Sequence, residues 1–186
     1  DQSAASDNAT TINVTATVAQ TALALKDNNT DAAKAVTVNL SGSVAVTAAA
    51  TFEAAHLNAA SMTGALTATL DPSLLKITGG SGNDTFNGVA ADGKYVLAGG
   101  AGNDQFITVH TSKNMSIVMS GIEVIDVTAG TADFAGSQLH QGTFIIKDTG
   151  AGSAMQIDDA TALDISTLDL SGLSFQNAAT TMVVNA

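Results

Sequence analysis

The sequence predicts an all-β protein, built as a parallel β-solenoid or β-roll with an N-terminal β-rich segment. Strand-like alternation runs through much of the chain, and two glycine–aspartate segments mark tight corners. Apolar residues make up 45% of the chain, yet aromatic residues make up only 4% and tryptophan is absent. A core of Ala, Val, Ile and Leu suits the thin, repetitive interior of a stacked solenoid.

The N-terminal part of the chain predicts strands joined by polar loops. Apolar and polar residues alternate, as in half-buried strands, over residues 11–18, 36–40, 44–47, 65–70 and 75–78. Residues 22–35 predict a loop with a short helical turn at 31–35. Residues 48–62 are rich in Ala and lack Gly and Pro, which predicts a helix. A ladder of small residues within the solenoid is the alternative for that stretch.

Two nine-residue segments share the pattern G-G-x-G-x-D-x-U-x, in which U is a large apolar residue: GGSGNDTFN at 79–87 and GGAGNDQFI at 99–107. This pattern resembles the calcium-binding β-roll repeat of RTX proteins. Glycine permits the positive φ angles that so tight a turn needs. Calcium takes six to eight oxygen ligands, which glycine carbonyls and an aspartate can supply. The predicted metal-site residues are Gly80, Gly82, Asn83, Asp84, Gly100, Gly102, Asn103 and Asp104.

The spacing of the two segments supports the calcium interpretation. Asp84 and Asp104 are 20 positions apart, close to the roughly 18 residues of one full turn of such a roll. The intervening half-turn would be residues 88–98, with a strand at 95–97 and two extra residues in the 91–93 loop. Phe86, Val96 and Phe106 then recur every ten positions. Strands stack about 4.8 Å apart, so two aspartates on neighbouring turns can share one ion.

Plain glycine-rich turns are the alternative to a calcium site. They would explain the glycines, but not the repeated aspartate, the repeated phenylalanine or the spacing.

Strand-like segments continue after the two motifs, at residues 116–119, 122–127, 143–148, 155–158, 162–165, 168–170 and 182–184. Several aspartates lie at strand ends or alternate outward: Asp126, Asp148, Asp158, Asp159, Asp164 and Asp169. They could hold further calcium ions or line asparagine-type corners, but a solvated acidic face is the favoured interpretation. We predict an N-terminal β-rich segment at 1–75, an RTX-type calcium β-roll at 76–110 and a continuing β-solenoid at 111–186. Together these form one elongated domain of a longer protein, since the first residue is Asp1 and not Met.

The charge of the chain argues against several partners. Fifteen Asp, two Glu, six Lys and no Arg give a net charge of −11. Nucleic acid binding needs clustered basic residues, which are absent. No apolar run approaches the ~20 residues of a membrane-spanning helix, and no signal peptide is present, so membrane insertion is not expected. The absence of Cys excludes disulfides and zinc–thiolate sites.

The sequence offers no support for an enzyme. His56, His110 and His140 are isolated, and exposed surface histidines are the simpler interpretation. The chain has no G-x-S-x-G nucleophile elbow, and its glycine-rich loops lack the lysine of a phosphate-binding loop. No catalytic residue is therefore predicted.

The chain resembles the RTX-containing surface-layer (S-layer) proteins of Gram-negative bacteria, of the Caulobacter and Campylobacter kind. The resemblance rests on the two motifs, on the phrase SGIEVIDVT at 120–128, and on residues 57–64 leading through strands into 77–80, with an echo near 168–173. It implies a type I-secreted, calcium-dependent protein of the cell surface that self-associates into a lattice. Lipopolysaccharide or another surface glycan would be contacted through other parts of the protein. Only two intact motifs are present, and residues 1–54 match nothing in the family.

The leading hypothesis is therefore a structural, calcium-binding module of a bacterial surface layer. One alternative is the C-terminal calcium-folding and secretion module of an RTX enzyme, toxin or adhesin, which a catalytic domain upstream would favour. Another is a carbohydrate-binding or adhesion domain that uses calcium to grip vicinal hydroxyls, so that a chelator would abolish sugar binding.

Overall fold

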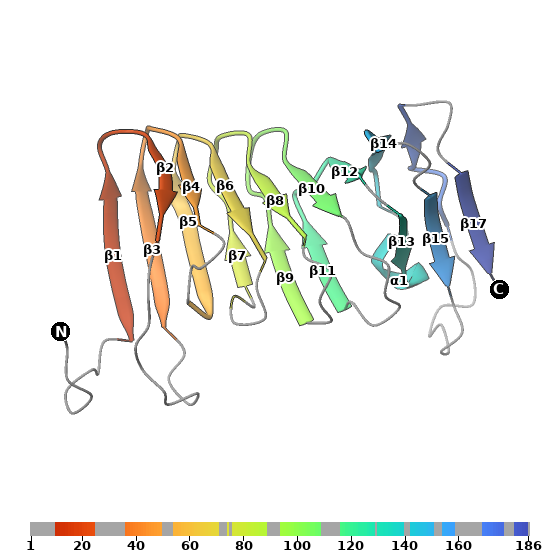
Figure 1. The fold of residues 1–186 in the computed structure, drawn as a ribbon, viewed down its shortest axis with the longest axis horizontal. Helices are drawn as coiled ribbons and strands as arrows, with labels where there is room; N and C mark the ends of the chain where they lie inside the picture. The colour runs from red at the N-terminus through yellow and green to blue at the C-terminus, as the bar shows by residue number, and fades with distance from the viewer. Residues whose placement is uncertain are drawn as a thin grey trace.

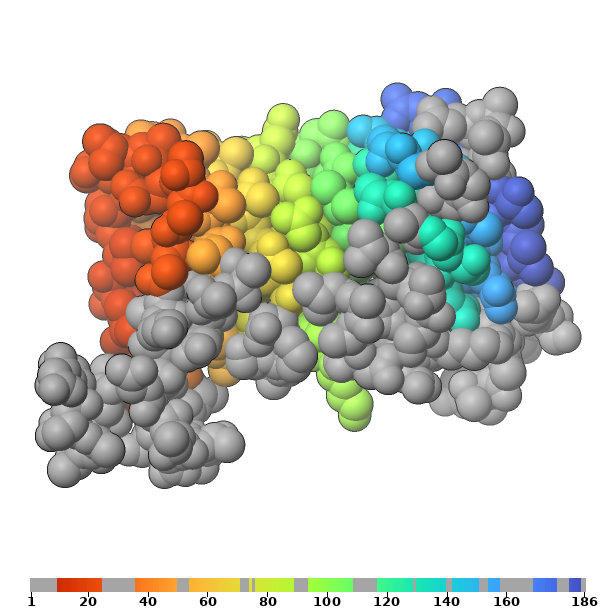
Figure 2. All heavy atoms as spheres, in the orientation of Figure 1, coloured from red at the N-terminus to blue at the C-terminus, as the bar shows by residue number. Residues whose placement is uncertain are grey.

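The chain forms a parallel β-solenoid with almost no helix, which confirms the predicted fold class (Figure 1). The computed structural model describes residues 10–24, 36–49, 54–70, 74, 76–88, 94–108, 116–128, 130–139, 142–150, 154–158, 169–176 and 181–185. The space-filling view shows that the solenoid is an elongated block, with the N-terminal turns at one end and the last strands at the other (Figure 2).

Successive strands alternate between two facing layers, and every pairing is parallel. The first sheet contains, in spatial order, β1 (Thr11–Ala16), β3 (Thr37–Gly42), β5 (His56–Met62), β7 (Lys76–Thr78), β9 (Lys94–Ala98) and β11 (Ser116–Ser120). The second sheet contains β2 (Gln20–Leu23), β4 (Val46–Ala48), β6 (Leu66–Thr69), β8 (Thr85–Asn87), β10 (Gln105–Thr108), β12 (Val124–Val127), β14 (Ile145–Asp148) and β16 (Ser174–Phe175). A third sheet of β13 (Thr131–Phe134), β15 (Ala154–Asp158) and β17 (Thr181–Asn185) lies at the C-terminal end of the stack, and its strands follow β12, β14 and β16 along the chain (Figure 1).

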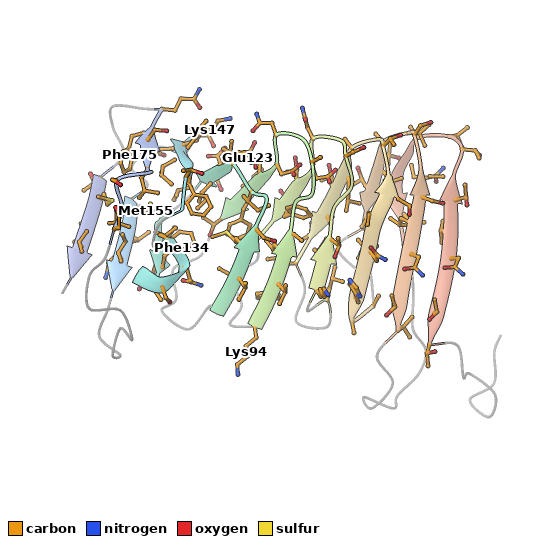
Figure 3. All side chains as sticks on the ribbon, turned by 180° about the vertical axis from the view of Figure 1, so that it is seen from behind. Lys94, Glu123, Phe134, Lys147, Met155 and Phe175 are labelled. Carbon is orange, nitrogen blue, oxygen red and sulfur yellow. The ribbon has the colours of Figure 1, made fainter. Side chains whose placement is uncertain are left out.

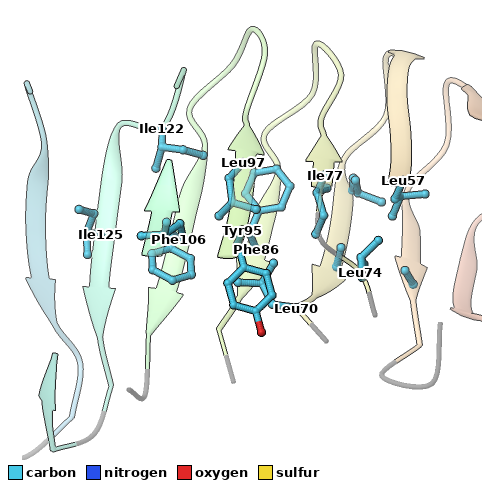
Figure 4. Packing of buried hydrophobic residues seen from close by; sticks show 14 of the residues in the cluster. Leu57, Leu70, Leu74, Ile77, Phe86, Tyr95, Leu97, Phe106, Ile122 and Ile125 are labelled. Carbon is cyan, nitrogen blue, oxygen red and sulfur yellow. The ribbon is translucent and has the colours of Figure 1, made fainter. Parts of the chain in front are cut away.

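The core lies between the layers and consists of side chains stacked turn upon turn (Figure 4). In the first sheet, Leu57, Ile77 and Leu97 are in register on consecutive turns, and all three are fully buried. In the second sheet, Phe86 stacks on Phe106. Identical or similar side chains at equivalent positions fill a narrow interior without the large aromatic core of a typical globular domain.

Short corners lead from the first sheet to the second along one long edge of the solenoid, at the top of Figure 1. The strand bounds give three-residue corners at 17–19, 43–45, 63–65 and 121–123, and six-residue corners at 79–84 and 99–104. The two glycine–aspartate motifs are therefore longer corners inserted within one column of short ones. Strand pairing continues across the predicted boundary near residue 75, because β5 pairs with β7 and β6 pairs with β8.

The predicted helix at 48–62 is wrong where the structure describes that stretch. Residues 56–62 form β5, in which Leu57, Ala59 and Met62 are buried. Alanine favours helices in isolation, but here its small side chain fits the interior between stacked sheets, and tertiary packing overrides the local preference. The alternative of a small-residue ladder is the correct one. Residues 50–53 and the helical turn predicted at 31–35 lie outside the described residues.

The predicted ten-residue apolar period is wrong at Val96. In β9, Tyr95 and Leu97 are buried, whereas the side chain of Val96 is 40% exposed. The two faces of a strand alternate residue by residue, so a displacement of one position moves a side chain from the core to the surface.

Three strands (β2, β13 and β16) and a four-residue helix, α1 (Gly136–Leu139), were not predicted. The helix lies beside β11, where the Gln138 side chain donates a hydrogen bond from Nε2 to the carbonyl oxygen of Ile117 at 3.0 Å. Of the later predicted strands, residues 162–165 lie outside the described residues, and 169–170 are not in a strand. Within the described segments, no helix has the length and hydropathy to cross a membrane.

Candidate cation site at the stacked corners

The two glycine–aspartate corners lie on the same side of the solenoid in adjacent turns, as their spacing predicts. Thr85 is in register with Gln105, and β9 occupies the intervening half-turn on the opposite sheet. A backbone hydrogen bond from Ala101 N to the Gly80 oxygen at 3.0 Å joins the two corners, and Gly79 N donates to the oxygen of Ala98, the last residue of β9, at 2.7 Å. The corners are therefore stacked directly on each other.

Each motif aspartate is the last residue of its corner and directly precedes a strand of the second sheet. Their side chains are 1% (Asp84) and 0% (Asp104) exposed. The strand registers align Asp84 with Leu66 of the preceding turn, and align Asp104 with Glu123 of the following turn. We call Asp84, Asp104 and Glu123 the acidic column. It interrupts an apolar row, because the buried side chains of Leu66 and Phe144 occupy the equivalent positions before and after it.

Each acid of the column accepts a hydrogen bond from the backbone of the turn before it. Asp84 Oδ1 accepts from Leu66 N at 2.7 Å, and Asp104 Oδ1 accepts from Asp84 N at 2.7 Å. Glu123 Oε2 accepts from Asp104 N at 2.8 Å. A buried amide without an acceptor is costly, so these carboxylates extend the pairing between turns into the corners.

The second carboxylate oxygens of the two aspartates differ in their surroundings. Asp84 Oδ2 accepts a hydrogen bond from Gly80 N at 2.7 Å. Asp104 Oδ2 is buried and has no hydrogen-bond partner. An unpaired charged oxygen in the interior carries a large desolvation penalty, which a bound cation would offset.

Glycine is required where these oxygens approach the neighbouring turn. A Cβ atom on Gly79 would overlap Asp84 Oδ2 and the carbonyl oxygen of Gly99. One turn further, a Cβ on Gly99 would overlap Asp104 Oδ2 and the carbonyl oxygen of Gly121. At both places an aspartate oxygen and a carbonyl oxygen of the next turn converge beside a bare glycine.

The other predicted site residues shape the corners. Gly100 and Gly102 have φ angles of +107° and +130°, in the region that favours glycine. Gly82 packs against the backbone of the preceding corner, where a Cβ would lie 2.7 Å from the carbonyl carbon of Gly64. Asn83 and Asn103 are exposed, and Asn83 Oδ1 accepts a hydrogen bond from Asn103 N at 3.0 Å. In this arrangement the asparagines link the corners at the surface.

Burial governs the ionisation of the two aspartates. Desolvation raises the pKa of Asp84, against the lowering effect of hydrogen bonds from Leu66 N and Gly80 N. Desolvation also raises the pKa of Asp104 to about 6, and the negative charges of Asp84 and Glu123 act in the same direction, while the hydrogen bond from Asp84 N opposes them. Close carboxylates in a buried site disfavour one another's charged form unless a cation compensates.

The chemistry of this donor set fits a hard divalent cation. It offers carboxylate and backbone carbonyl oxygens, which are the ligands that calcium prefers. In the part of the chain that the structure describes, no three His, Asp or Glu side chains are grouped so as to hold a metal by themselves. A cation at the corners would therefore draw several ligands from carbonyl groups, as the glycine-rich sequence leads one to expect.

The acidic residues outside the column have other environments. The solvated-face interpretation is wrong for Asp126 and Asp148, which are 4% and 8% exposed. Asp126 accepts hydrogen bonds from Gln105 Nε2 at 3.0 Å and from Thr149 Oγ1 at 2.9 Å. Asp169 is half-buried and accepts a hydrogen bond from Ser171 N at 3.0 Å.

Of the remaining predicted residues, Asp159, Asp164, His110 and His140 lie outside the described residues, as does the side chain of Asp158. His56 is half-buried rather than exposed, and its Nε2 lies 3.5 Å from Thr78 Oγ1. Burial, together with the charge of Lys76, lowers the pKa of His56.

Glu123 belongs to the column although the sequence did not single it out. The available signal was its separation of 19 residues from Asp104, close to the 20 residues between the two aspartates. The three-residue corner at 121–123 has a single glycine and lacks the motif, so its equivalence becomes visible only through the strand register.

No family model matches the chain, and no curated protein or solved structure shows significant similarity to it.

Proposed function

We propose that this chain is a structural, calcium-binding module of a bacterial surface layer, secreted to the cell surface, that folds fully with calcium and self-associates into a lattice. The observation that carries the proposal is the pair of stacked, buried aspartates, of which Asp104 has a carboxylate oxygen without a partner. The resemblance of the two motifs to RTX repeats of surface-layer proteins supplies the biological setting.

Calcium would act by neutralising the acidic column. Without a cation, Asp84 and Asp104 are buried carboxylates on adjacent turns; desolvation raises the pKa of both, and the charge of Asp84 raises the pKa of Asp104 further. A site with a Kd of about 10⁻⁴–10⁻³ M suits the millimolar calcium found outside cells. At calcium tenfold above Kd, each independent site adds roughly 1.4 kcal/mol to stability. In the low-calcium cytosol the chain would remain poorly folded and competent for type I export.

Self-association is supported by the two ends of the solenoid. Near the C-terminal end, Phe175 of β16 and Met182 and Val184 of β17 are 43%, 38% and 46% exposed. Near the N-terminal end, Val18 is 65% exposed. In the described part of the chain, β1 and β17 each pair with a single strand. Exposed apolar side chains beside open strand edges are typical contact surfaces between protein molecules.

The proposal is tested by titrating calcium into chelator-treated protein, with circular dichroism as the readout and magnesium as the control ion, followed by negative-stain electron microscopy of the same sample. We expect β-structure to form with calcium, and sheets or regular arrays to appear. Calcium-dependent folding without arrays would contradict the surface-layer part and favour a secretion or adhesion module of an RTX protein. A spectrum unaffected by calcium would contradict the whole proposal.

A further inference from the structure

We propose that the corner at residues 121–123 closes a second cation position, in which Glu123 and the carbonyl oxygen of Gly121 act together with Asp104. This inference rests on the proposed calcium binding, and it assigns to calcium a carboxylate outside both sequence motifs. It also fixes the number of ions that the acidic column holds.

The register of the turns makes Glu123 equivalent to the motif aspartates. Gln105 pairs with Val124, so Glu123 lies beside Asp104 in the way that Asp104 lies beside Asp84. The hydrogen bonding repeats as well, because Glu123 Oε2 accepts from Asp104 N just as Asp104 Oδ1 accepts from Asp84 N. Glu123 therefore performs in its short corner the backbone role that the motif aspartate performs in the long ones. Figure 3 shows Glu123 toward the corner end of the sheets.

The unpartnered oxygen of the column faces the Glu123 corner. Asp104 Oδ2 and the carbonyl oxygen of Gly121 converge beside Gly99, at the point that a Cβ atom would fill. The equivalent oxygen one turn earlier, Asp84 Oδ2, already accepts a hydrogen bond from Gly80 N, whereas Asp104 Oδ2 has no such donor. A carboxylate oxygen of the column therefore lacks a hydrogen-bond donor between the Asp104 corner and the Glu123 corner.

The acidic column ends on both sides, which limits the number of ions. Leu66 precedes Asp84 and Phe144 follows Glu123 in the same inward row, and neither side chain offers a ligand. Three acids in consecutive turns leave two positions between turns, one between Asp84 and Asp104 and one between Asp104 and Glu123. We therefore infer two calcium ions at this column, held by hard oxygen ligands.

The test is isothermal titration calorimetry with calcium chloride on the chelator-treated chain, comparing wild type with Glu123→Gln. Glutamine keeps an oxygen that can accept from Asp104 N but removes the charge. The matched control is Asp169→Asn, which removes one negative charge from a half-buried residue that bonds Ser171 and lies outside the column. Circular dichroism in the absence and presence of calcium reports whether each variant folds.

We expect two ions for wild type and for the Asp169→Asn control. For Glu123→Gln we expect one ion, or a second Kd raised at least about tenfold, because carboxylates at and around a metal control its affinity. Unchanged stoichiometry and affinity in Glu123→Gln would overturn this inference and leave the proposed calcium function standing. An absence of calcium binding by the wild type would overturn the proposed function itself.

A second variant keeps the inference falsifiable if Glu123→Gln does not fold. Glu123→Asp retains the charge but withdraws it by one methylene group. We expect it to fold and to bind the second ion more weakly than wild type, while wild-type affinity in this variant would contradict a direct role for Glu123.

Discussion

Replacing Asp104 by asparagine should stabilise the calcium-free protein at neutral pH, although it removes a residue of the proposed site. Asparagine keeps an Oδ1 atom that can accept from Asp84 N, as Asp104 does at 2.7 Å. It replaces the unpartnered Oδ2 with an amide nitrogen, which can donate to the nearby carbonyl oxygen of Gly121. The variant thus exchanges a buried charge for a satisfied neutral group.

The magnitude follows from the ionisation of Asp104. Its pKa is raised from 3.8 to about 6, and a tenfold change in an ionisation constant corresponds to about 1.4 kcal/mol. The whole increase in pKa would cost the folded wild type about 3 kcal/mol above pH 7. The neighbouring residues Gly100 and Asn103 are exposed, and water around them screens part of this penalty. We therefore expect Asp104→Asn to gain about 1–3 kcal/mol of unfolding free energy without calcium.

The pH dependence has a defined sign. The pKa of Asp104 is higher in the folded protein than in the unfolded chain, so the unfolded chain loses its proton first as the pH rises. The contribution of Asp104 to stability therefore falls from about pH 4 to about pH 6 and is constant at higher pH. Burial raises the pKa of Asp84 as well, so a smaller decline should remain in Asp104→Asn.

Urea unfolding followed by circular dichroism measures these effects in wild type and Asp104→Asn, at about pH 4.5 and pH 7.5, with chelator and with excess calcium. In chelator the variant should be more stable than wild type at the higher pH. Calcium should stabilise wild type strongly and the variant weakly, reversing their order. A variant less stable than wild type in chelator, or an equal gain from calcium in both proteins, would refute this reasoning.

Three further substitutions test the packing around the column, each by urea unfolding. Asp84→Asn should destabilise the protein by about 1–3 kcal/mol with or without calcium, because an amide nitrogen would face the donor Gly80 N; equal stability would contradict the assigned hydrogen bonds. Gly99→Ala should lower the unfolding free energy by about 1–3 kcal/mol or more and abolish calcium binding, because its Cβ would overlap the carbonyl oxygen of Gly121. A variant that still binds calcium would show that the turns are not packed so closely at Gly99. Phe106→Ala should lower the unfolding free energy by about 3–5 kcal/mol, whereas the control Val96→Ala should lower it by less than about 0.5 kcal/mol. Similar losses would contradict the alternation of buried and exposed side chains along β9 and β10.

The fold class and the stacking of the two corners could be predicted because they depend on local pattern. The repeated G-G-x-G-x-D segment fixes a tight corner, and the 20-residue spacing leaves room for one strand on the opposite sheet. These are short-range features, and the solenoid places equivalent positions of successive turns directly beside one another.

Other features could not be predicted because they depend on contacts between turns. Residues 56–62 carry the alanines of a helix but become a strand, since neighbouring strands on both sides supply hydrogen bonds and a flat apolar surface. Asp126 is buried because Gln105 and Thr149 come from adjacent turns to bond it, which no local pattern reveals. Glu123 joins the acidic column only through strand register, since its own corner lacks the motif.

The most direct measurement of calcium binding at the corners is a crystal structure grown with excess calcium, with anomalous difference data collected at long wavelength. We predict anomalous density at the acidic column, with a peak between the corners at 99–104 and 121–123 that lies within about 2.3–2.6 Å of Asp104 Oδ2. The same corners without anomalous density, and with Asp104 Oδ2 bonded to a water molecule or to a protein donor instead, would contradict calcium binding there.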